Sequence, residues 1–306
     1  MNSTTDPFFR QAAQQLNTEK LTVSRAVQSF LYDRELTPNT RKTYKSNLRR
    51  FRRAYGNHPV QKVDGDLMKL YLDGLRSAQG DVLAPSTYNR HFNTLRTFFN
   101  WVAQFHKLKR GSPMQGLEPK RLPDRLPRDL TISVQERIFR RITSLRDRAL
   151  FTLLLEAGLR INEALSLDIE DLKLGEGRIR VLGKGGTERE AYPSKEAIRY
   201  VKRYVKERGR PLSGPLFVSR QGRLSYDMAY RLFRRYTDGI TDQGKPLSIH
   251  QLRHTYGSRR AGKMDALILR DLMGHKSLRT TQQYARVNPS VLQKAVRRYE
   301  IGEGVS

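Results

Sequence analysis

Apolar residues recur every three or four positions over residues 21–106, which is the period of a helix with one buried face. The first such segment runs from Val23 to Leu36. In it the apolar side chains stand at Val23, Ala26, Val27, Phe30 and Leu31. Three further segments with this spacing follow: Asn39 to Tyr55, Gly65 to Ser77, and Ala84 to Val102. We therefore predict an N-terminal domain of four helices over residues 21–106, preceded by a flexible tail over residues 1–20.

A change of pattern marks the end of this domain. Residues 107–128 hold four Pro and two Gly with no apolar period, which predicts an extended linker. In residues 129–306 we expect helices from about Val134, over Arg148–Glu156 and over Ile161–Leu167. Arg178–Leu182 and Glu188–Tyr192 flank a glycine-rich turn and predict a β-hairpin. We expect the rest to be helical, so the fold class is mainly α with a small antiparallel β-sheet.

The net charge of the chain indicates what kind of ligand it binds. The 306 residues contain 58 Lys and Arg, most of them Arg, against 30 Asp and Glu, and the net charge is +28. The excess occurs in both halves of the chain, and since self-repulsion would weaken a fold, it indicates a polyanionic ligand. On charge alone, structural RNA is an alternative to DNA.

One predicted helix, Asn39 to Tyr55, concentrates this charge. Between Arg41 and Arg53 it carries seven cations and no acid, which favours phosphate contact over an ordinary solvated helix face. The predicted DNA-contacting residues are Arg41, Lys42, Lys45, Arg49, Arg50, Arg52 and Arg53.

Several classes of protein are excluded or disfavoured. The chain has no cysteine, so disulfides, thiol catalysis and Cys-ligated zinc are excluded. The first residues do not form a signal peptide, and no apolar run approaches the ~20 residues that span a bilayer. We expect a soluble cytoplasmic protein with no membrane partner.

Four short segments carry candidate chemistry. His250 and Arg253 stand three residues apart, so on a helix both project from one face and can bind a phosphate and move a proton near it. Gly274 suits the left-handed end of the preceding helix and fixes His275 at a turn, nine residues before Tyr284. Each segment also has an ordinary interpretation: His250 and Arg253 can belong to an amphipathic helix with no further role, and Tyr284 can be a tyrosine packed in the core.

The other two segments are earlier in the chain. Arg160 follows Gly158 between two apolar helices, where a long side chain is drawn inward and needs a partner. That partner is either Glu163, one turn on, or a bound phosphate. Lys184 stands at the glycine-rich hairpin tip, where the alternative is a plain surface loop with a solvated lysine.

Taken in this order, these residues resemble the motifs of the tyrosine recombinase (phage-integrase-like) family, and among its members the simple two-domain Xer-type recombinases. The resemblance covers roughly residues 22–300. It implies an N-terminal core-binding domain and a catalytic domain that cleaves and rejoins DNA through a 3′-phosphotyrosine. The residues that match the catalytic motifs are Arg160, Lys184, His250, Arg253, His275 and Tyr284.

The resemblance also implies roles. Tyr284 is the nucleophile, and Arg160, Arg253 and His275 bind the non-bridging phosphate oxygens. Lys184 protonates the departing 5′ oxygen, and His250 assists proton transfer. Cationic groups of this kind stabilise the added charge of the transition state that a metal neutralises elsewhere, so we expect no metal, ATP or other cofactor.

The implied partners are double-stranded DNA with an inverted-repeat core site, and a homotetramer on two duplexes or an assembly with a related recombinase subunit. Residues 289–306 are expected to form a helix that docks on a neighbouring subunit; the alternative is a helix that packs on its own chain or a frayed terminus. Two other functions remain open from the sequence: a type IB topoisomerase, which shares such a pocket, and a non-catalytic basic DNA-binding protein.

Overall fold

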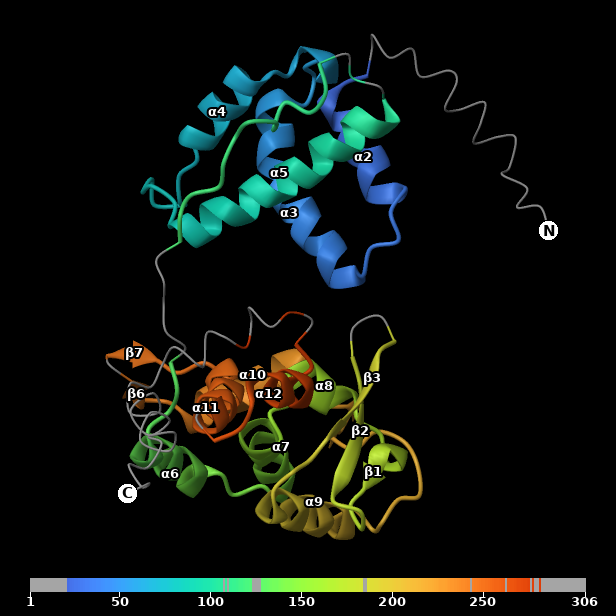
Figure 1. Cartoon of the computed structure of the whole chain (residues 1–306), viewed down its shortest axis with the longest axis vertical. Helices are drawn as coiled ribbons and strands as arrows, with labels where there is room; N and C mark the ends of the chain where they lie inside the picture. The colour runs from blue at the N-terminus through green and yellow to red at the C-terminus, as the bar shows by residue number, and fades with distance from the viewer. Residues whose placement is uncertain are drawn as a thin grey trace, which may run out of the picture. The chain divides into compact units, whose positions relative to one another are not determined.

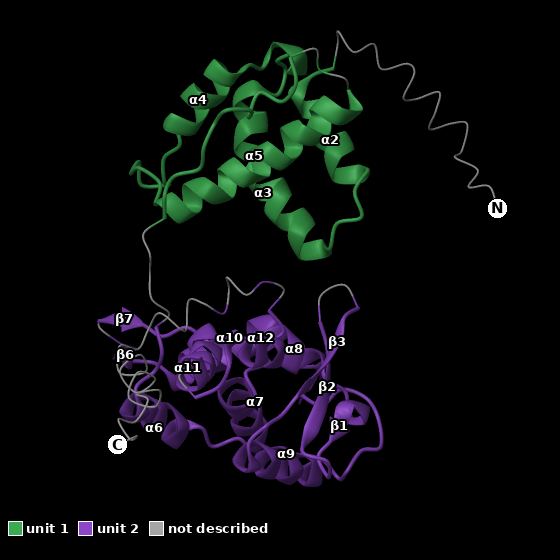
Figure 2. Ribbon diagram, in the orientation of Figure 1, with its two compact units in different colours: residues 1–124 green, residues 125–306 purple. Residues whose placement is uncertain are grey.

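A computed structural model of the chain describes residues 21–106, 108, 110–122, 128–183, 186–242, 244–261, 263–275, 277 and 281. The chain divides into two compact units, residues 1–124 and 125–306 (Figure 2). Each unit has its own apolar core. No helix in the described ranges is both long and apolar enough to cross a membrane.

Unit 1 is helical (Figure 1). Its elements are α2 (Val23–Tyr32), α3 (Pro38–Tyr55), the 3-10 turn η2 (Val60–Lys62), α4 (Gly65–Asp73) and α5 (Pro85–Phe105). The four predicted helices are therefore present, but α2 and α4 end about four residues before the predicted Leu36 and Ser77. The α2 end is closed by Arg41, whose guanidinium donates to the carbonyl oxygens of Leu31 and Arg34.

Aromatic side chains fill the core of unit 1. Phe30, Phe51, Phe98 and Phe99 are fully buried and meet edge to face, with ring centroids 5.4 Å apart for Phe30–Phe98 and 5.5 Å for Phe51–Phe99. Such pairs stabilise a core beyond their buried area. The one-faced apolar pattern of the sequence therefore brings α2, α3 and α5 together, and the cations of α3 remain outside.

Unit 2 is mainly helical, with short strands on its surface (Figure 1). Its helices are α6 (Ile132–Arg141), α7 (Leu145–Glu156), α8 (Ile161–Ser166), α9 (Lys195–Glu207), α10 (Tyr226–Tyr236), α11 (His250–Ala261) and α12 (Ala266–Met273), with the 3-10 turn η3 (Ile169–Asp171). Its strands are β1 (Leu172–Lys173), β2 (Arg178–Leu182), β3 (Glu188–Ala191), β4 (Val218–Ser219), β5 (Gly222–Arg223), β6 (Thr241–Asp242) and β7 (Lys245–Pro246).

The predicted hairpin is the β2–β3 pair, with Val181 opposite Arg189, and β1 adds a third antiparallel strand to it. The fold class is confirmed. The expectation that the remainder is helical was wrong, because the pairs β4–β5 and β6–β7 form two further small sheets. Strands of two residues are too short to show an alternating pattern, so the sequence gives no sign of them.

Helix α7 is the centre of unit 2. Leu150, Phe151, Leu153 and Leu154 are all buried, and α9 and α11 pack against the helix. A helix that is apolar on every side belongs in a core, with its ends next to other elements. The end of α7 at Ala157 and Gly158 is where the candidate residues gather.

Hydroxyl and carboxylate side chains cap most helix starts, each accepting from a backbone N–H of the first turn. These caps are Thr22, Thr37, Asp64, Thr131, Ser144, Ser194, Ser225 and Asp265. At its other end, α12 stops at Gly274 in the left-handed conformation, with φ 59° and ψ 45°, as the sequence predicts. This turn sets the position of His275.

Candidate active site

Four of the six candidate catalytic residues come together in unit 2, around α8, α11 and α12 (Figure 1). Arg160 directly precedes α8, His250 and Arg253 occupy the first turn of α11, and His275 follows the end of α12. A hydrogen bond of 2.9 Å from Nη2 of Arg160 to the carbonyl oxygen of Gly274 joins the first and last of these segments. Lys184 and Tyr284 lie outside the described residues.

The ends of two helices hold the arginines. Arg253 donates from Nη1 to the carbonyl oxygen of Gly158, just after α7, and from Nη2 to that of Met273, the last residue of α12. Arg160 donates to the next carbonyl, that of Gly274. Carbonyl groups at helix C-termini have no partner within the helix and carry the negative end of the helix dipole. The fold thus fixes both guanidiniums through backbone atoms.

A buried carboxylate, Glu163, links the arginines. Its side chain is 7% exposed and accepts from Nη1 of Arg160 at 2.6 Å and from Nη2 of Arg189 at 2.7 Å. It also accepts from the backbone N–H of Arg160 at 2.9 Å and lies 3.7 Å from Nη1 of Arg253. Three guanidiniums share one carboxylate, so two positive charges of the cluster are not balanced within it. An anion is the natural complement.

Glu163 is held in its charged form. Burial raises the pKa of this carboxyl, but the Arg189 guanidinium, the hydrogen bonds from Arg160 and the charge of Arg253 together lower the pKa below its ordinary value. Burial lowers the pKa of Arg189 while Glu163 raises it, and burial prevails. The carboxylate therefore ties down the arginines and leaves their excess positive charge in place.

Arg160 is less buried than the sequence suggests. Its side chain is 42% exposed, although it bonds both Glu163 and Gly274, whereas the side chain of Arg253 is 8% exposed. The choice between Glu163 and a phosphate as the partner of Arg160 is thus not exclusive: the carboxylate takes one edge of the guanidinium and much of the rest faces solvent.

His275 lies in the field of this cluster. Burial, followed by the charges of Arg253, Arg160 and Arg189, lowers the pKa of the imidazole to about 4. Nδ1 lies 2.9 Å from the hydroxyl oxygen of Thr281, the next described residue after Ser277. The ring is therefore neutral at physiological pH, and an anion that enters the pocket would raise its pKa back toward the ordinary value.

His250 and His254 share one environment. Burial and then Arg253 lower the pKa of His250, and burial, His250 and Arg253 lower that of His254. A neutral imidazole offers one donor and one acceptor nitrogen, which suits proton transfer at a phosphate. His254 is not among the residues that the sequence motifs single out, although it directly follows Arg253.

Arg189 is the principal residue that sequence reasoning missed. It lies on β3 on the same face as Ala191, which is buried, and its side chain is 14% exposed. An arginine at an inward position of a short strand was the available signal. Gly274 makes room for it: a Cβ there would lie 2.7 Å from Cδ of Arg189 and closer still to its Nε.

In unit 1, all seven predicted DNA-contacting cations of α3 are exposed, and none forms an ion pair with an acid of the described residues. Arg41 differs from the other six because its guanidinium also closes the end of α2. The placement of these cations suits contact with a polyanion, and within the described ranges six of them form no hydrogen bond or ion pair through their side chains.

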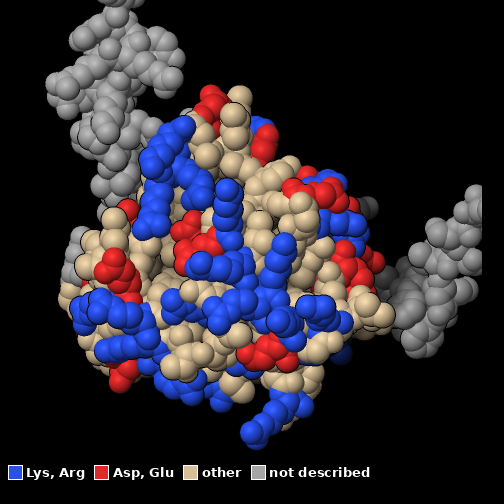
Figure 3. Space-filling model, turned by 90° about the horizontal axis from the view of Figure 1, so that it is seen from below, with Lys and Arg blue, Asp and Glu red and all other residues tan. Residues whose placement is uncertain are grey.

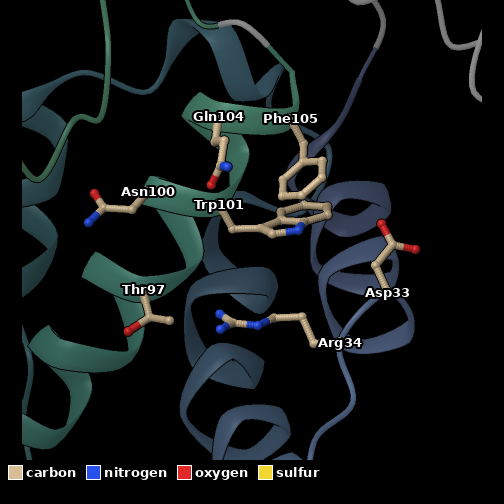
Figure 4. A pocket seen from close by; sticks show the side chains of 7 residues that line it. All are labelled: Asp33, Arg34, Thr97, Asn100, Trp101, Gln104 and Phe105. Atoms are coloured by element: carbon tan, nitrogen blue, oxygen red, sulfur yellow. The ribbon is translucent and has the colours of Figure 1, made fainter.

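A separate hollow of about 420 Å³ in unit 1 lies between the end of α2 and the C-terminal half of α5 (Figure 4). The residues that line it are Asp33, Arg34, Thr97, Asn100, Trp101, Gln104 and Phe105. One cation and one acid offset each other in this lining, and the Trp101 and Phe105 rings lie 5.4 Å apart. It has no excess of positive charge, so we do not count it among the predicted phosphate contacts.

Comparison with known proteins agrees with this geometry. Residues 129–290 match the model of the phage integrase family, which covers more than half of the chain, and residues 23–106 match the phage integrase N-terminal SAM-like domain. The chain belongs to the phage integrase family. It is a tyrosine recombinase, an enzyme that cleaves and rejoins DNA.

Its relatives include tyrosine recombinases of the Xer type. Tyrosine recombinase XerC of Pelobacter propionicus is 31% identical over 269 residues, 84% of this chain and 87% of that protein. Tyrosine recombinase XerD of Pseudomonas putida is 30% identical over 274 residues, 86% and 91% of the two chains.

Two solved structures share the fold. The XerH site-specific recombinase bound to palindromic difH substrate, in a post-cleavage complex, is 20% identical with a TM-score of 0.69 and coverage of 97% of this chain and 90% of that one. A lambda integrase dimer bound to a COC′ core site is 19% identical with a TM-score of 0.70 and coverage of 86% and 95%.

Proposed function

We propose that this recombinase cuts one DNA strand at a time by attack of Tyr284 on a phosphodiester held by Arg160, Arg253 and His275. The observation that carries the proposal is the cluster around Glu163, where three fixed guanidiniums share one carboxylate. A phosphodiester carries one negative charge and gains another as the phosphorus becomes pentavalent. Cations that are already in position stabilise that charge without reorganisation.

The bonds change in two balanced steps. The phenol oxygen of Tyr284 gives its proton to a neighbouring base and bonds to phosphorus, and the bond to the 5′ oxygen breaks, leaving a 3′-phosphotyrosine. Lys184 gives the departing 5′ oxygen its proton, and His250 assists in the transfer. The 5′ hydroxyl of another strand then attacks the same phosphorus and releases Tyr284. The energy of the original bond is kept in the intermediate, so no cofactor takes part.

The histidines fit these roles in their neutral form. His275, whose pKa is lowered to about 4, enters the reaction with one N–H to donate to a phosphate oxygen. The phosphate charge then raises the pKa of the imidazole toward its ordinary value. A phenol has a pKa near 10, and the same cations make its deprotonation more favourable.

The DNA partner that we propose is a duplex with an inverted-repeat core site, gripped by unit 2 at the cleaved phosphate and by the α3 cations along its backbone. Support comes from the exposed cations of α3, which form no ion pair with an acid of the described residues, and from two related structures, of XerH bound to a palindromic difH substrate and of lambda integrase bound to a COC′ core site. Recombination needs two duplexes, so we propose a tetramer, of this chain alone or with a related subunit, and a cytoplasmic site of action. A C-terminal helix over residues 289–306 that docks on a neighbouring subunit is part of this proposal and lies outside the described residues.

The test uses a nicked duplex that carries a site recovered by binding selection, because the nick lets the 5′ product diffuse away and traps the covalent adduct. Tyr284→Phe should form no detectable adduct and should bind the duplex with unchanged affinity in a mobility-shift assay. Tyr226→Phe, at a 40% exposed tyrosine of α10, is the matched control and should form the adduct at the wild-type rate. An adduct that survives in Tyr284→Phe overturns the assignment. Relaxation of plasmids that lack the site would instead indicate a topoisomerase.

A further inference from the structure

A hollow of about 660 Å³ in unit 2 lies between α9 and the η3–β1 segment. Helix α9 lies on the side of unit 2 away from α12 (Figure 1). Its apolar lining consists of Ile169, Leu172, Leu174, Val205, Pro211 and Leu212. Its cationic lining consists of Lys202, Arg203, Lys206 and Arg210. None of these residues belongs to the candidate active site or to the α3 cations, and the volume lies in the range of pockets that bind ligands.

The rim of this hollow is a loop with a fixed shape. Arg208, at the end of α9, donates to the carbonyl oxygens of Pro215 and Leu216, both at 2.7 Å. Between these anchors Arg210 has a φ of 55°, a left-handed conformation that is rare for a residue with a side chain. The result is that Leu212 stands 93% exposed at the edge of an apolar hollow. Backbone strain of this kind concentrates at functional sites.

The cations around the hollow have no acidic partner among the described residues. All four cations are exposed, and none forms an ion pair with an acid in the described part of the chain. Two of the neighbouring acids are engaged, since Glu170 accepts from the backbone N–H of Gly214 at 3.1 Å and Asp171 pairs with Arg180 at 2.8 Å. The exposed Glu207 of α9 is one acid beside four cations. Seen from the α9 side, Lys and Arg outnumber the acids on this face (Figure 3). The complementary ligand is therefore acidic.

The ligand must also carry apolar groups, because the floor of the hollow is apolar. A phosphate backbone has nothing to fill a floor of Leu172, Leu174 and Val205, and single-stranded nucleic acid is bound by stacking its bases on aromatic side chains, of which this lining has none. Acidic side chains beside large aliphatic ones satisfy both the rim and the floor. We propose that this hollow, the α9 groove, docks an acidic segment of a partner protein that inserts leucine-like side chains beside Leu212. The proposal does not depend on which residues cut DNA.

The probe is a synthetic fluorescein-labelled peptide of about 12 residues in which Leu pairs are flanked by Glu. Its binding to the full chain is followed by fluorescence anisotropy. We expect a Kd on the order of 10–100 µM, and roughly tenfold weaker binding by Leu212→Ser and by the pair Lys206→Glu and Arg210→Glu. A peptide with Ser in place of Leu should lose about the same factor.

Two matched controls locate the effect. Leu70→Ser changes a leucine of α4 that is 72% exposed, and Arg231→Glu with Arg234→Glu reverses two exposed cations of α10. Neither should change the affinity for the peptide, and Leu212→Ser should leave DNA cleavage unchanged.

Three results would overturn the proposal. One is no binding of the peptide up to about 1 mM. Another is peptide binding that is insensitive to Leu212→Ser, which reveals a merely basic surface. The third is that Leu212→Ser and the pair Lys206→Glu and Arg210→Glu weaken binding of a labelled single-stranded oligonucleotide as much as they weaken binding of the peptide. The occupant of the α9 groove would then be a nucleic acid.

Discussion

Gly274→Ala is the substitution that probes the arginine cluster most selectively. The new Cβ would lie 2.7 Å from Cδ of Arg189 and closer to its Nε, so the Arg189 side chain must shift, and we expect the shift to break its bond to Glu163. The substitution also forces alanine into a left-handed conformation, because φ is +59°. These two costs can be separated by comparison with Gly239, where φ is +66° and no atom lies within 4 Å of an added Cβ.

The magnitudes follow from the contacts. Left-handed strain costs about 1 kcal/mol and is common to Gly239→Ala and Gly274→Ala. Displacement of Arg189 adds the loss of its charged hydrogen bond to Glu163, about 2 kcal/mol. The free energy of unfolding should therefore fall by about 1 kcal/mol in Gly239→Ala and by about 3 kcal/mol in Gly274→Ala. Cleavage of the nicked duplex should slow by about 10–100-fold in Gly274→Ala alone, because Arg160 bonds both Glu163 and the Gly274 carbonyl.

The assay is urea denaturation followed by circular dichroism, with single and double variants. In an Arg189→Ala background there is no side chain to displace, so Gly274→Ala should cost only the strain of about 1 kcal/mol. If Gly274→Ala costs the same with and without Arg189, the two residues are not coupled and the reasoning is refuted.

Three further predictions concern charge. Glu163→Gln removes the carboxylate that the three guanidiniums share. We expect the free energy of unfolding to fall by about 3 kcal/mol in urea denaturation, and adduct formation on the nicked duplex to slow at least about 100-fold. Wild-type stability in this variant would contradict the shared-carboxylate arrangement. The folded pKa of His275, about 4, is below its ordinary value of 6.5, so the unfolded chain binds the proton more tightly and stability should be lost as pH falls from about 6.5 toward 4. For a half-exposed ring this loss of stability is at most about 1 kcal/mol at pH 5.5. The loss should be smaller in His275→Gln. An equal loss in the wild-type protein and in His275→Gln would show that His275 does not titrate in this way. Lys45→Ala should weaken duplex binding at every sequence and reduce the slope of log Kd against log salt by about 0.9, and an unchanged slope would remove Lys45 from the DNA contacts.

The helices could be predicted from the sequence because they depend on local chemistry, whereas the meeting of Arg160, Arg253 and His275 was expected only from the family resemblance, since these residues lie far apart in the chain. A one-faced apolar pattern specifies α3 and α5, a Thr-Pro pair starts α3, and Gly274 ends α12 in the conformation that a glycine permits. These signals lie within a few residues of the feature they determine.

The hydrogen bonds and ion pairs that connect those residues could not be predicted. Glu163 was visible as a partner for Arg160 one turn away, but its bond to Arg189, 26 residues further on, depends on how the β2–β3 hairpin lies against α8. The α9 groove depends on packing in the same way, since its walls come from Ile169 to Gly175 and from Lys202 to Leu212. No periodicity encodes such contacts between segments.

The identity of the residue that bonds covalently to DNA decides the proposed mechanism most directly. The adduct trapped on a nicked duplex can be digested with nuclease and trypsin, and the nucleotide-bearing peptide fragmented by mass spectrometry. Cleavage after Arg279 and Arg286 releases residues 280–286, and the account predicts the added nucleotide mass on Tyr284 within this peptide. A nucleotide on Thr281, or on a residue of any other peptide, would contradict it.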